Sequence, residues 1–365
     1  MLGHVERFGV GYRHLKSSCR SPRCVTYLRS NCDTGDAPRV SKSEVVATAV
    51  MERVRAIGPV VALLLASCAH GPEATPSRSG HLVADDGVRL HYQVYGNGPP
   101  EIVVPLQYWN EPAFRDIGRN RTIAYYDPRG RRNSGAVKEA SGYSIARDLL
   151  DLHLVLDALQ ARRPTLIGTS YYGALVARFA MLRPERVGRL VLVGALYPAR
   201  TPHVNYNPPE AAARTDEAAV ARLKELRETP SSERDPLAYC LAYWDVNGPL
   251  TVGDPAFHRR RSYPCDLANE TPDNLSAWAA GIFASLGDWD WRSDAQSIRA
   301  PTLVIHGRRD LLVPLESSEE WARLIPNAHL VVLDGAGHIP WWEFEREMRR
   351  LVDDFAAERR GAERE

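Results

Sequence analysis

From Gly80 onward, short apolar runs alternate with amphipathic segments, and this alternation constrains the fold more than any other feature. The apolar runs are EIVVPL, RTIAYYD, PTLIGTS, RLVLVGA, PTLVIHG and HLVVLDG. Such short, β-branched runs are typical of strands buried on both faces. Helices are predicted over 144–161, 171–182, 315–324 and 340–357. The pattern predicts an α/β fold with an open, mostly parallel sheet covered by helices on both faces.

The alternation breaks over 197–292, which contains many prolines and an aromatic cluster that includes Trp244 and Trp278. An insertion that follows a strand of such a sheet lies at the edge where ligands bind. We therefore expect 80–196 and 293–365 to form the core and 197–292 to form a helical cap. The aromatic residues either line a substrate pocket or form the core of the cap.

Composition and charge narrow the range of partners. The 365 residues are 44% hydrophobic and 25% charged, and the formal net charge is +1. A nearly neutral chain of this kind gives no reason to expect a nucleic acid as partner. No phosphate loop, CxxC pair or paired metal-ligand motif occurs, so we expect no metal ion and no organic cofactor.

The segment 51–67 has the form of a secretory signal peptide. A short Arg-bearing start precedes an apolar stretch and small residues. LASC ends at Cys68 and resembles the bacterial lipobox, so 51–67 is expected to be a lipoprotein signal, Cys68 the lipidated residue and 68–79 a tether. This predicts an exported protein held on a membrane of the bacterial cell envelope. The alternative is a buried apolar helix with a chance cysteine.

Residues 1–50 precede this signal, so we expect them to be a disordered extension that is not part of the native protein. Export also bears on Cys240 and Cys265, since disulfides form in oxidising compartments. The sequence leaves a bonded pair and two separate buried thiols equally open.

A serine, an aspartate and a histidine follow three of the predicted strands. GTSYYG places Ser170 on a strand-to-helix turn, HGRRDLLVP places Asp310 after a later strand, and GAGHIPWWE places His338 after the last one. A serine needs a base to take its proton, and a carboxylate orients that base. The order Ser, Asp, His is the one expected on this fold. The three residues are predicted to form a catalytic triad.

These stretches, together with YDPRGRRNSG, resemble the α/β-hydrolases, and within that fold the proline iminopeptidase group. The resemblance implies an α/β-hydrolase fold with an inserted cap and an oxyanion hole built from two backbone N–H groups. Tyr171 follows the nucleophile and would supply the first. The second falls in PLQYWNEP, where the family has His-Gly, and is assigned here to Gln107.

The resemblance also implies a carboxylate in the cap that grips the free amino group of a peptide. Glu270 is the candidate, with a surface carboxylate as the alternative, and Trp244 and Trp278 are candidate substrate-binding residues. The resulting hypothesis is an aminopeptidase acting on small peptides through an acyl-enzyme. The alternatives are a carboxylesterase or amidase acting on small acyl substrates, and a lipoprotein that binds a ligand without catalysis.

Overall fold

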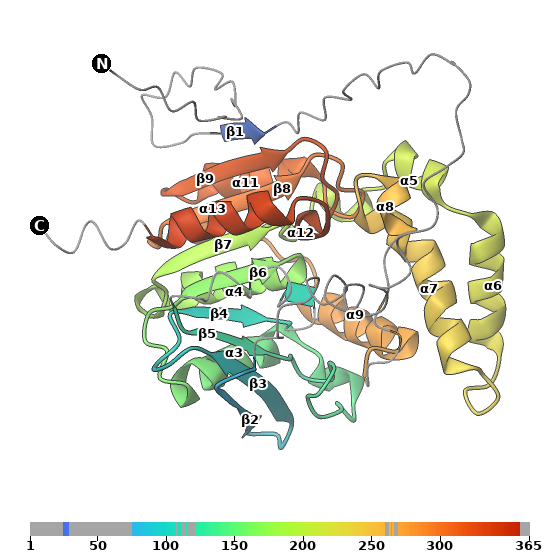
Figure 1. Ribbon diagram of the computed structural model, residues 1–365, viewed down its shortest axis with the longest axis horizontal. Coiled ribbons are helices and arrows are strands. Elements are labelled where there is room, and N and C mark those ends of the chain that lie inside the picture. The colour runs from blue at the N-terminus through green and yellow to red at the C-terminus, as the bar shows by residue number, and fades with distance from the viewer. Residues whose placement is uncertain are drawn as a thin grey trace, which may run out of the picture.

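The computed structural model describes residues 25–28, 75–106, 109–110, 114, 121–259, 263, 265 and 269–357. Its centre is a nine-stranded sheet in the order β1-β9-β8-β7-β6-β4-β5-β3-β2 (Figure 1). The strands are β1 Val25–Leu28, β2 Arg78–Val83, β3 Arg89–Tyr95, β4 Ile102–Pro105, β5 Ile123–Tyr126, β6 Thr165–Thr169, β7 Arg189–Val193, β8 Thr302–Gly307 and β9 Ala328–Leu333. All neighbouring pairs are parallel except β2 with β3 and β3 with β5.

Helices cover both faces of this sheet. Successive residues of a strand point to opposite faces, so each strand contributes side chains to both helical layers. Leu166 of β6 packs with one group of helices, whereas Ile167 belongs to the core on the other face. The first face is covered by α3 Ile145–Ala158, α4 Tyr171–Leu182, α10 Arg292–Ala295 and α11 Leu315–Leu324. The second is covered by α12 Pro340–Glu343 and α13 Glu345–Ala357. The predicted α/β-hydrolase architecture, with a mostly parallel sheet between helical layers, is confirmed.

The chain between β7 and β8 is mainly helical, as the broken alternation predicted. It contains α5 Pro209–Arg214, α6 Glu217–Glu228, α7 Pro236–Thr251, α8 Pro255–His258 and α9 Pro272–Leu286. Figure 1 shows α6 and α7 side by side at one end of the molecule, away from the sheet. Short 3-10 turns lie at Ala140–Gly142, Pro184–Arg186 and His203–Asn205. We call the segment 197–292 the cap.

The structure differs from the sequence prediction near the N-terminus. We expected no folded element in 1–50, but Val25–Leu28 forms β1, which pairs in parallel with β9 in the register Val25 to Leu330. The run VTYL is rich in strand-forming residues, and β9 would otherwise leave its backbone groups unpaired at the edge of the sheet. Cys68, the signal segment and most of the tether lie outside the described residues.

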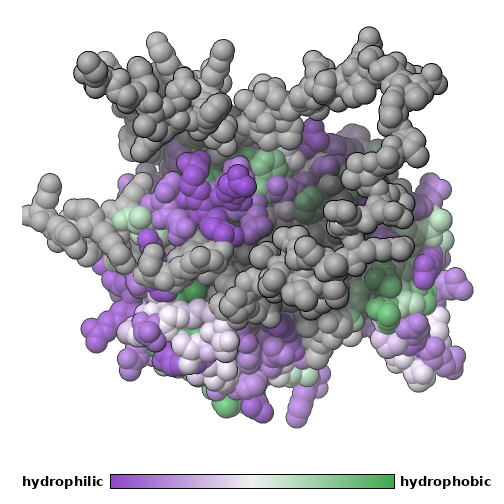
Figure 2. Space-filling model, viewed as in Figure 1, coloured by the Kyte–Doolittle hydropathy of each residue, from purple (hydrophilic) through white to green (hydrophobic). Residues whose placement is uncertain are grey.

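No helix in the described part of the chain is long and apolar enough to cross a membrane. The described surface that faces the viewer in Figure 2 is mainly hydrophilic. Exposed apolar side chains do occur in the cap, for instance Leu237 and Leu241 on α7.

Candidate active site

Ser170 occupies a sharp turn between β6 and α4 and has a backbone conformation that non-glycine residues rarely adopt, with φ 51° and ψ −127°. Such strain persists only where the surroundings enforce it, and it is frequent at functional sites. Two hydrogen bonds hold the turn against the following strand: Ser170 N–H donates to the Val193 carbonyl (2.9 Å), and Leu196 N–H donates to the Ser170 carbonyl (2.9 Å). Ser170 therefore has the geometry of a nucleophile elbow.

A nucleophile elbow usually has the pattern G-x-S-x-G, and Tyr172 stands where its second glycine is expected. This tyrosine does not obstruct the turn. The close approach of strand and helix is made by Gly168 and Gly173. A Cβ at Gly168 would lie 2.2 Å from the Tyr172 carbonyl oxygen, and a Cβ at Gly173 would lie 2.7 Å from the Cβ of Ala195. The Tyr172 ring instead stacks on Trp278 of the cap, with 6.1 Å between centroids. The large side chain fits because it points to the cap.

Asp310 and His338 meet at the same edge of the sheet. His338 Nδ1 lies 2.7 Å from Asp310 Oδ2, and the other carboxylate oxygen accepts the N–H groups of Leu312 (2.8 Å) and Val313 (2.9 Å). Burial favours the neutral acid, but His338, His306 and the Val313 N–H outweigh it, so the pKa of Asp310 is lowered. Gly194, one residue beyond β7, packs against both side chains. His338 and Asp310 thus lie beside the end of β7, the strand whose Val193 carbonyl binds the N–H of Ser170.

A second histidine supports the acid. His306 is fully buried on β8, and its Nε2 lies 3.2 Å from the Val313 carbonyl and 3.6 Å from Asp310 Oδ2. Its Nδ1 lies 2.8 Å from Ser318 Oγ. A carbonyl can only accept, so Nε2 carries the hydrogen and Nδ1 accepts from the hydroxyl. Burial lowers the pKa of His306, which favours its neutral imidazole.

Tyr171 opens α4, so its N–H has no partner within the helix and is placed as an oxyanion donor would be. Its hydroxyl donates to Asp148 Oδ2 on α3 at 2.8 Å. Burial raises the pKa of Asp148 to about 7, against the opposing effect of the Tyr171 hydrogen bond. Gln107, the predicted second oxyanion donor, lies outside the described residues.

Glu270 is committed to an ion pair within the protein. Both of its oxygens accept from Arg131: Nε to Oε1 at 3.0 Å and Nη2 to Oε2 at 2.8 Å. Both side chains are buried, and the guanidinium lies over the Trp278 ring at 5.3 Å from the ring centroid. The negative charge of Glu270 is therefore already neutralised by a residue of the core.

The two candidate tryptophans occupy different surroundings. Trp278 packs against the elbow, with its ring 5.5 Å from the Tyr171 ring. Trp244 stacks on Tyr263 at 4.6 Å and lies 5.3 Å from Trp109, which follows β4. Only Trp278 adjoins the nucleophile turn, whereas Trp244 joins the cap to the loop after β4.

Cys240 on α7 and Cys265 are joined by a disulfide with a Cα–Cα distance of 5.6 Å. The structure thus has a bonded pair where the sequence left two possibilities open. Within the described ranges, no group of three or more His, Cys, Asp or Glu side chains is arranged to hold a metal ion.

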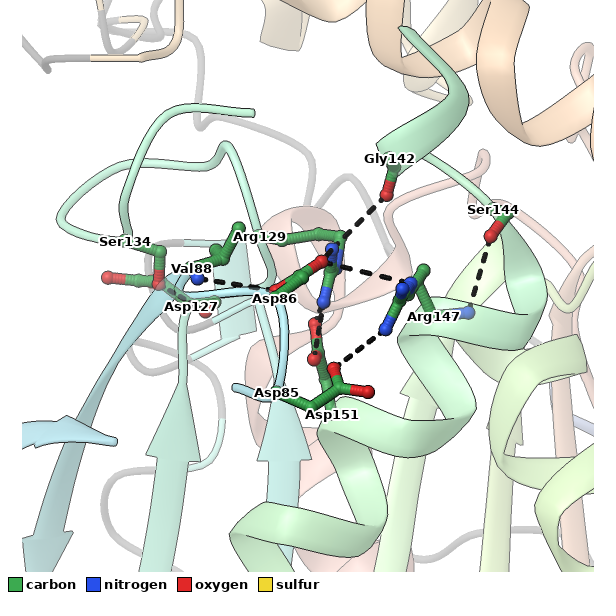
Figure 3. A network of polar contacts seen from close by, with 10 residues as sticks. All are labelled: Asp85, Asp86, Val88, Asp127, Arg129, Ser134, Gly142, Ser144, Arg147 and Asp151. Atoms are coloured by element: carbon green, nitrogen blue, oxygen red, sulfur yellow. Dashed lines mark hydrogen bonds and ion pairs between the residues drawn. The ribbon is translucent and has the colours of Figure 1, made fainter. Parts of the chain in front are cut away.

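The motif YDPRGRRNSG contains two arginines that tie the loop after β5 to other segments, which its sequence alone did not reveal. Arg129 is buried and binds both oxygens of Asp151 at 2.7 Å, and it also binds Asp86 at 2.7 Å (Figure 3). It therefore links the loop after β5 to α3 and to the turn between β2 and β3. Arg131, two residues later, links the same loop to the cap through Glu270.

The sequence profile of the α/β-hydrolase fold matches residues 106–345. Over 289 residues the chain is 27% identical to a 2-hydroxy-6-oxo-2,4-heptadienoate hydrolase of Pseudomonas putida, covering 76% of this chain and 96% of the relative. It is 29% identical to a putative carbamate hydrolase of Pseudomonas syringae, covering 64% and 82% of the two chains.

Among solved structures, an esterase from Exiguobacterium antarcticum superposes with a TM-score of 0.57 at 18% identity, covering 76% of this chain and 99% of the esterase. That likeness concerns the fold alone. The names of these relatives support the general family and do not single out the expected proline iminopeptidase group. With the profile match spanning most of the chain, the protein belongs to the α/β-hydrolase fold family.

Proposed function

We propose that this protein is a serine hydrolase that cleaves small ester or amide substrates through a covalent acyl-enzyme. The observation that carries the proposal is the short hydrogen bond between His338 and Asp310, beside a strand whose neighbour ends in the strained turn of Ser170. A buried carboxylate that binds Nδ1 holds the imidazole with Nε2 free to act as a base.

In the proposed reaction, His338 Nε2 takes the proton of Ser170 Oγ as this oxygen attacks the acyl carbon. The developing oxyanion is stabilised by backbone N–H groups, that of Tyr171 among them. The leaving alcohol or amine departs with the proton from His338, and the acyl group stays on Ser170. Water, deprotonated by His338, then releases the carboxylic acid and restores the serine.

The state of Glu270 favours small acyl substrates over peptides with a free N-terminus. A carboxylate that grips an ammonium group must have charge to offer, but Arg131 occupies both oxygens of Glu270. The aromatic surface that Trp278 presents next to Tyr171 suits an apolar acyl or leaving group. The name of one relative, a putative carbamate hydrolase, agrees with this preference.

Two measurements test the proposal. A fluorophosphonate probe is expected to label the wild type and to leave Ser170→Ala unlabelled. A panel of p-nitrophenyl acetate, p-nitrophenyl butyrate, an acyl anilide and prolyl- and alanyl-naphthylamides is expected to show ester cleavage at the highest rate. A folded wild type that neither reacts with the probe nor turns over any of these compounds would instead identify a binding protein.

We also propose that the protein is exported and anchored to a membrane of the cell envelope through lipid on Cys68. The mature chain would then lack residues 1–67, β1 among them, and β9 would become an edge strand of its sheet. The LASC sequence and the Cys240–Cys265 disulfide support this placement, because disulfides persist in oxidising compartments. Mass spectrometry of the N-terminal peptide from the membrane fraction tests it. A protein recovered without lipid, or with residues 51–67 still attached, would refute the anchor.

A further inference from the structure

The carboxylate of Glu343 binds backbone N–H groups of both the core and the cap. Glu343 ends α12, five residues after His338. Its Oε2 accepts the N–H of Gly337, the residue directly before His338, at 2.9 Å. It also accepts the N–H groups of two cap residues that follow α7, Gly253 (2.9 Å to Oε2) and Asp254 (2.9 Å to Oε1). A carboxylate can only accept, so its two oxygens satisfy all three donors at once.

The histidine loop and this part of the cap pack backbone against backbone. A Cβ at Gly337 would lie 2.3 Å from the Val252 carbonyl carbon, and a Cβ at Gly253 would lie 2.0 Å from the Gly335 carbonyl oxygen. Only glycine allows so close an approach at both positions. Gly253 and Gly337 are buried, so their N–H groups need partners within the protein. The carboxylate of Glu343 is the partner of both.

A second hydrogen bond ties the cap to the histidine loop. The N–H of Ile339, directly after His338, donates to the Thr251 carbonyl at the end of α7, at 3.1 Å. The N–H directly before His338 donates to Glu343. The backbone is therefore fixed on both sides of the histidine, once by the carboxylate and once by the cap itself.

The cap segment that Glu343 binds is also fixed from its other side. Arg214 of α5 donates to the carbonyl oxygens of Val252 (2.5 Å, from Nη1) and Gly253 (3.0 Å, from Nη2). The carbonyl groups of this segment thus face a cation, whereas its N–H groups face the carboxylate of Glu343. Both ends of the peptide dipoles have charged partners, so the segment has a defined position against the histidine loop.

The short helix that carries Glu343 is held in place by its tryptophans. The indole N–H of Trp341 donates to the Trp109 carbonyl, in the loop after β4, at 2.8 Å. The Trp109 ring stacks on the ring of Trp342, with 5.2 Å between centroids. Glu343 therefore projects from a helix that is itself docked on the core.

We propose that Glu343 is a positioning residue for His338, an inference that rests on the proposed hydrolase function. With the backbone fixed on both sides, the imidazole stays where Asp310 Oδ2 lies 2.7 Å from its Nδ1. A base must lie within hydrogen-bond reach of the proton that it takes, so a small shift of its loop lowers the rate. Through Glu343, the placement of the base depends on the docking of the cap.

The first test is Glu343→Gln, measured on p-nitrophenyl butyrate. The amide has the same size but turns one acceptor oxygen into an NH₂ group, which faces a backbone N–H whichever way the amide lies. We expect kcat to fall ~10- to 100-fold with little change in KM, because the base acts in the chemical step and not in binding. Glu343→Asp keeps the carboxylate on a shorter side chain and is expected to give an intermediate kcat.

The second test separates positioning from general structural damage. Glu343→Gln is combined with His338→Ala, and kcat is compared with that of His338→Ala alone, which keeps the residual catalysis of the oxyanion hole. If Glu343 acts through His338, its effect disappears once the imidazole is gone, and the two rates are expected to agree within about twofold. A loss of stability or of substrate binding would instead persist in both backgrounds.

Asp235→Ala is the matched control. The Asp235 carboxylate also accepts two backbone N–H groups of the cap, those of Leu237 (2.9 Å) and Ala238 (3.3 Å). It lies at the start of α7, the end opposite to Thr251. Its removal is expected to lower the urea midpoint, because the helix loses its N-cap, and to leave kcat within about twofold of the wild type.

Three results would each overturn the inference. They are a folded Glu343→Gln with kcat within about twofold of the wild type, an equal loss of kcat with and without the His338 imidazole, and a loss in Asp235→Ala as large as that in Glu343→Gln. If Glu343→Gln does not fold, Glu343→Asp takes its place in all three comparisons. Failure of the proposed function has a different signature, because Ser170→Ala would then retain the wild-type rate and the fluorophosphonate probe would not label the wild type.

Discussion

The guanidinium of Arg131 holds the carboxylate of Glu270 through two hydrogen bonds, in a pair that joins the loop after β5 to the cap and is almost wholly buried. The two residues lie 139 positions apart in the sequence. They fasten the cap to the core directly above the nucleophile turn, since Trp278 contacts both the guanidinium and the ring of Tyr171.

Glu270→Gln is expected to reduce the free energy of unfolding by about 3 kcal/mol, because it leaves the buried Arg131 charge without its counter-ion. Urea denaturation followed by tryptophan fluorescence gives this value. Replacing both residues, as Arg131→Met with Glu270→Leu, should recover much of the loss. If Glu270→Gln instead left stability unchanged and raised KM only for aminoacyl substrates, Glu270 would be an amine ligand after all.

Asp310→Asn is expected to lower kcat by ~10⁴-fold while the fold is retained. The amide would offer an N–H or a neutral oxygen where His338 Nδ1 now meets a carboxylate, and the imidazole would lose the tautomer that it needs. Steady-state kinetics on the preferred ester gives the loss, and circular dichroism checks the fold. Asp334→Asn serves as a control, because the Asp334 carboxylate pairs with Arg308 away from this contact. A variant with more than a tenth of the wild-type rate would exclude Asp310 as the orienting acid.

Gly168→Ala is expected to cost about 3 kcal/mol or more and to abolish activity, since its Cβ would fall 2.2 Å from a backbone oxygen of α4. Tyr172→Phe is expected to cost no more than about 1 kcal/mol, because it keeps the ring that stacks on Trp278, removes only the hydroxyl and leaves the two glycines of the elbow in place. Thermal unfolding and kcat for the pair test this assignment. Gly80→Ala, where the nearest atom is the Tyr92 hydroxyl at 3.2 Å, controls for the loss of a glycine.

Asp148 predicts a pH-dependent stability. Burial raises the folded pKa of Asp148 to about 7, above the usual aspartate value of 3.8, so between these pH values the native state holds a proton that the unfolded state has released. The contribution of this carboxyl is therefore fully present below about pH 4 and is lost as the pH rises through 7. Asp148→Asn should remove this slope, on the order of 1–4 kcal/mol in total. Urea midpoints at pH 4.5 and 8 for both proteins measure it, and parallel pH dependences would contradict the assignment.

The sequence was sufficient to predict the sheet, the cap and three residues that the fold brings to one edge. Ser170, Asp310 and His338 each follow a strand, and the carboxyl ends of parallel strands meet at the same edge. The order of these residues and strands in the chain was therefore enough to predict that the three residues lie at one edge of the sheet. The close packing of Gly173 beneath the elbow followed from its lack of a side chain.

What the sequence could not reveal depends on contacts between distant segments. Leu106, just after β4, has a left-handed backbone with φ 64°, and nothing in the sequence marks it, because glycine is the residue that usually signals that conformation. Glu270 looked like an available carboxylate, since its partner Arg131 stands in another part of the chain. The pairing of β1 was hidden for the same reason: four residues without periodicity join a sheet only when an edge is offered.

The hydrogen bond from Trp341 to Trp109 spans 232 positions and has a consequence for the order in which the protein matures. Synthesis, and translocation in the exported protein that we propose, deliver Ser170 and the first strands of the sheet before β9, His338 and Trp341, and folding begins from the N-terminal part of the chain. The elbow can form while the base is still unsynthesised. In the proposed mechanism the base therefore joins the site last, when the segment that carries His338 and Trp341 binds the loop after β4, and a chain that lacks this segment is expected to have no hydrolytic activity.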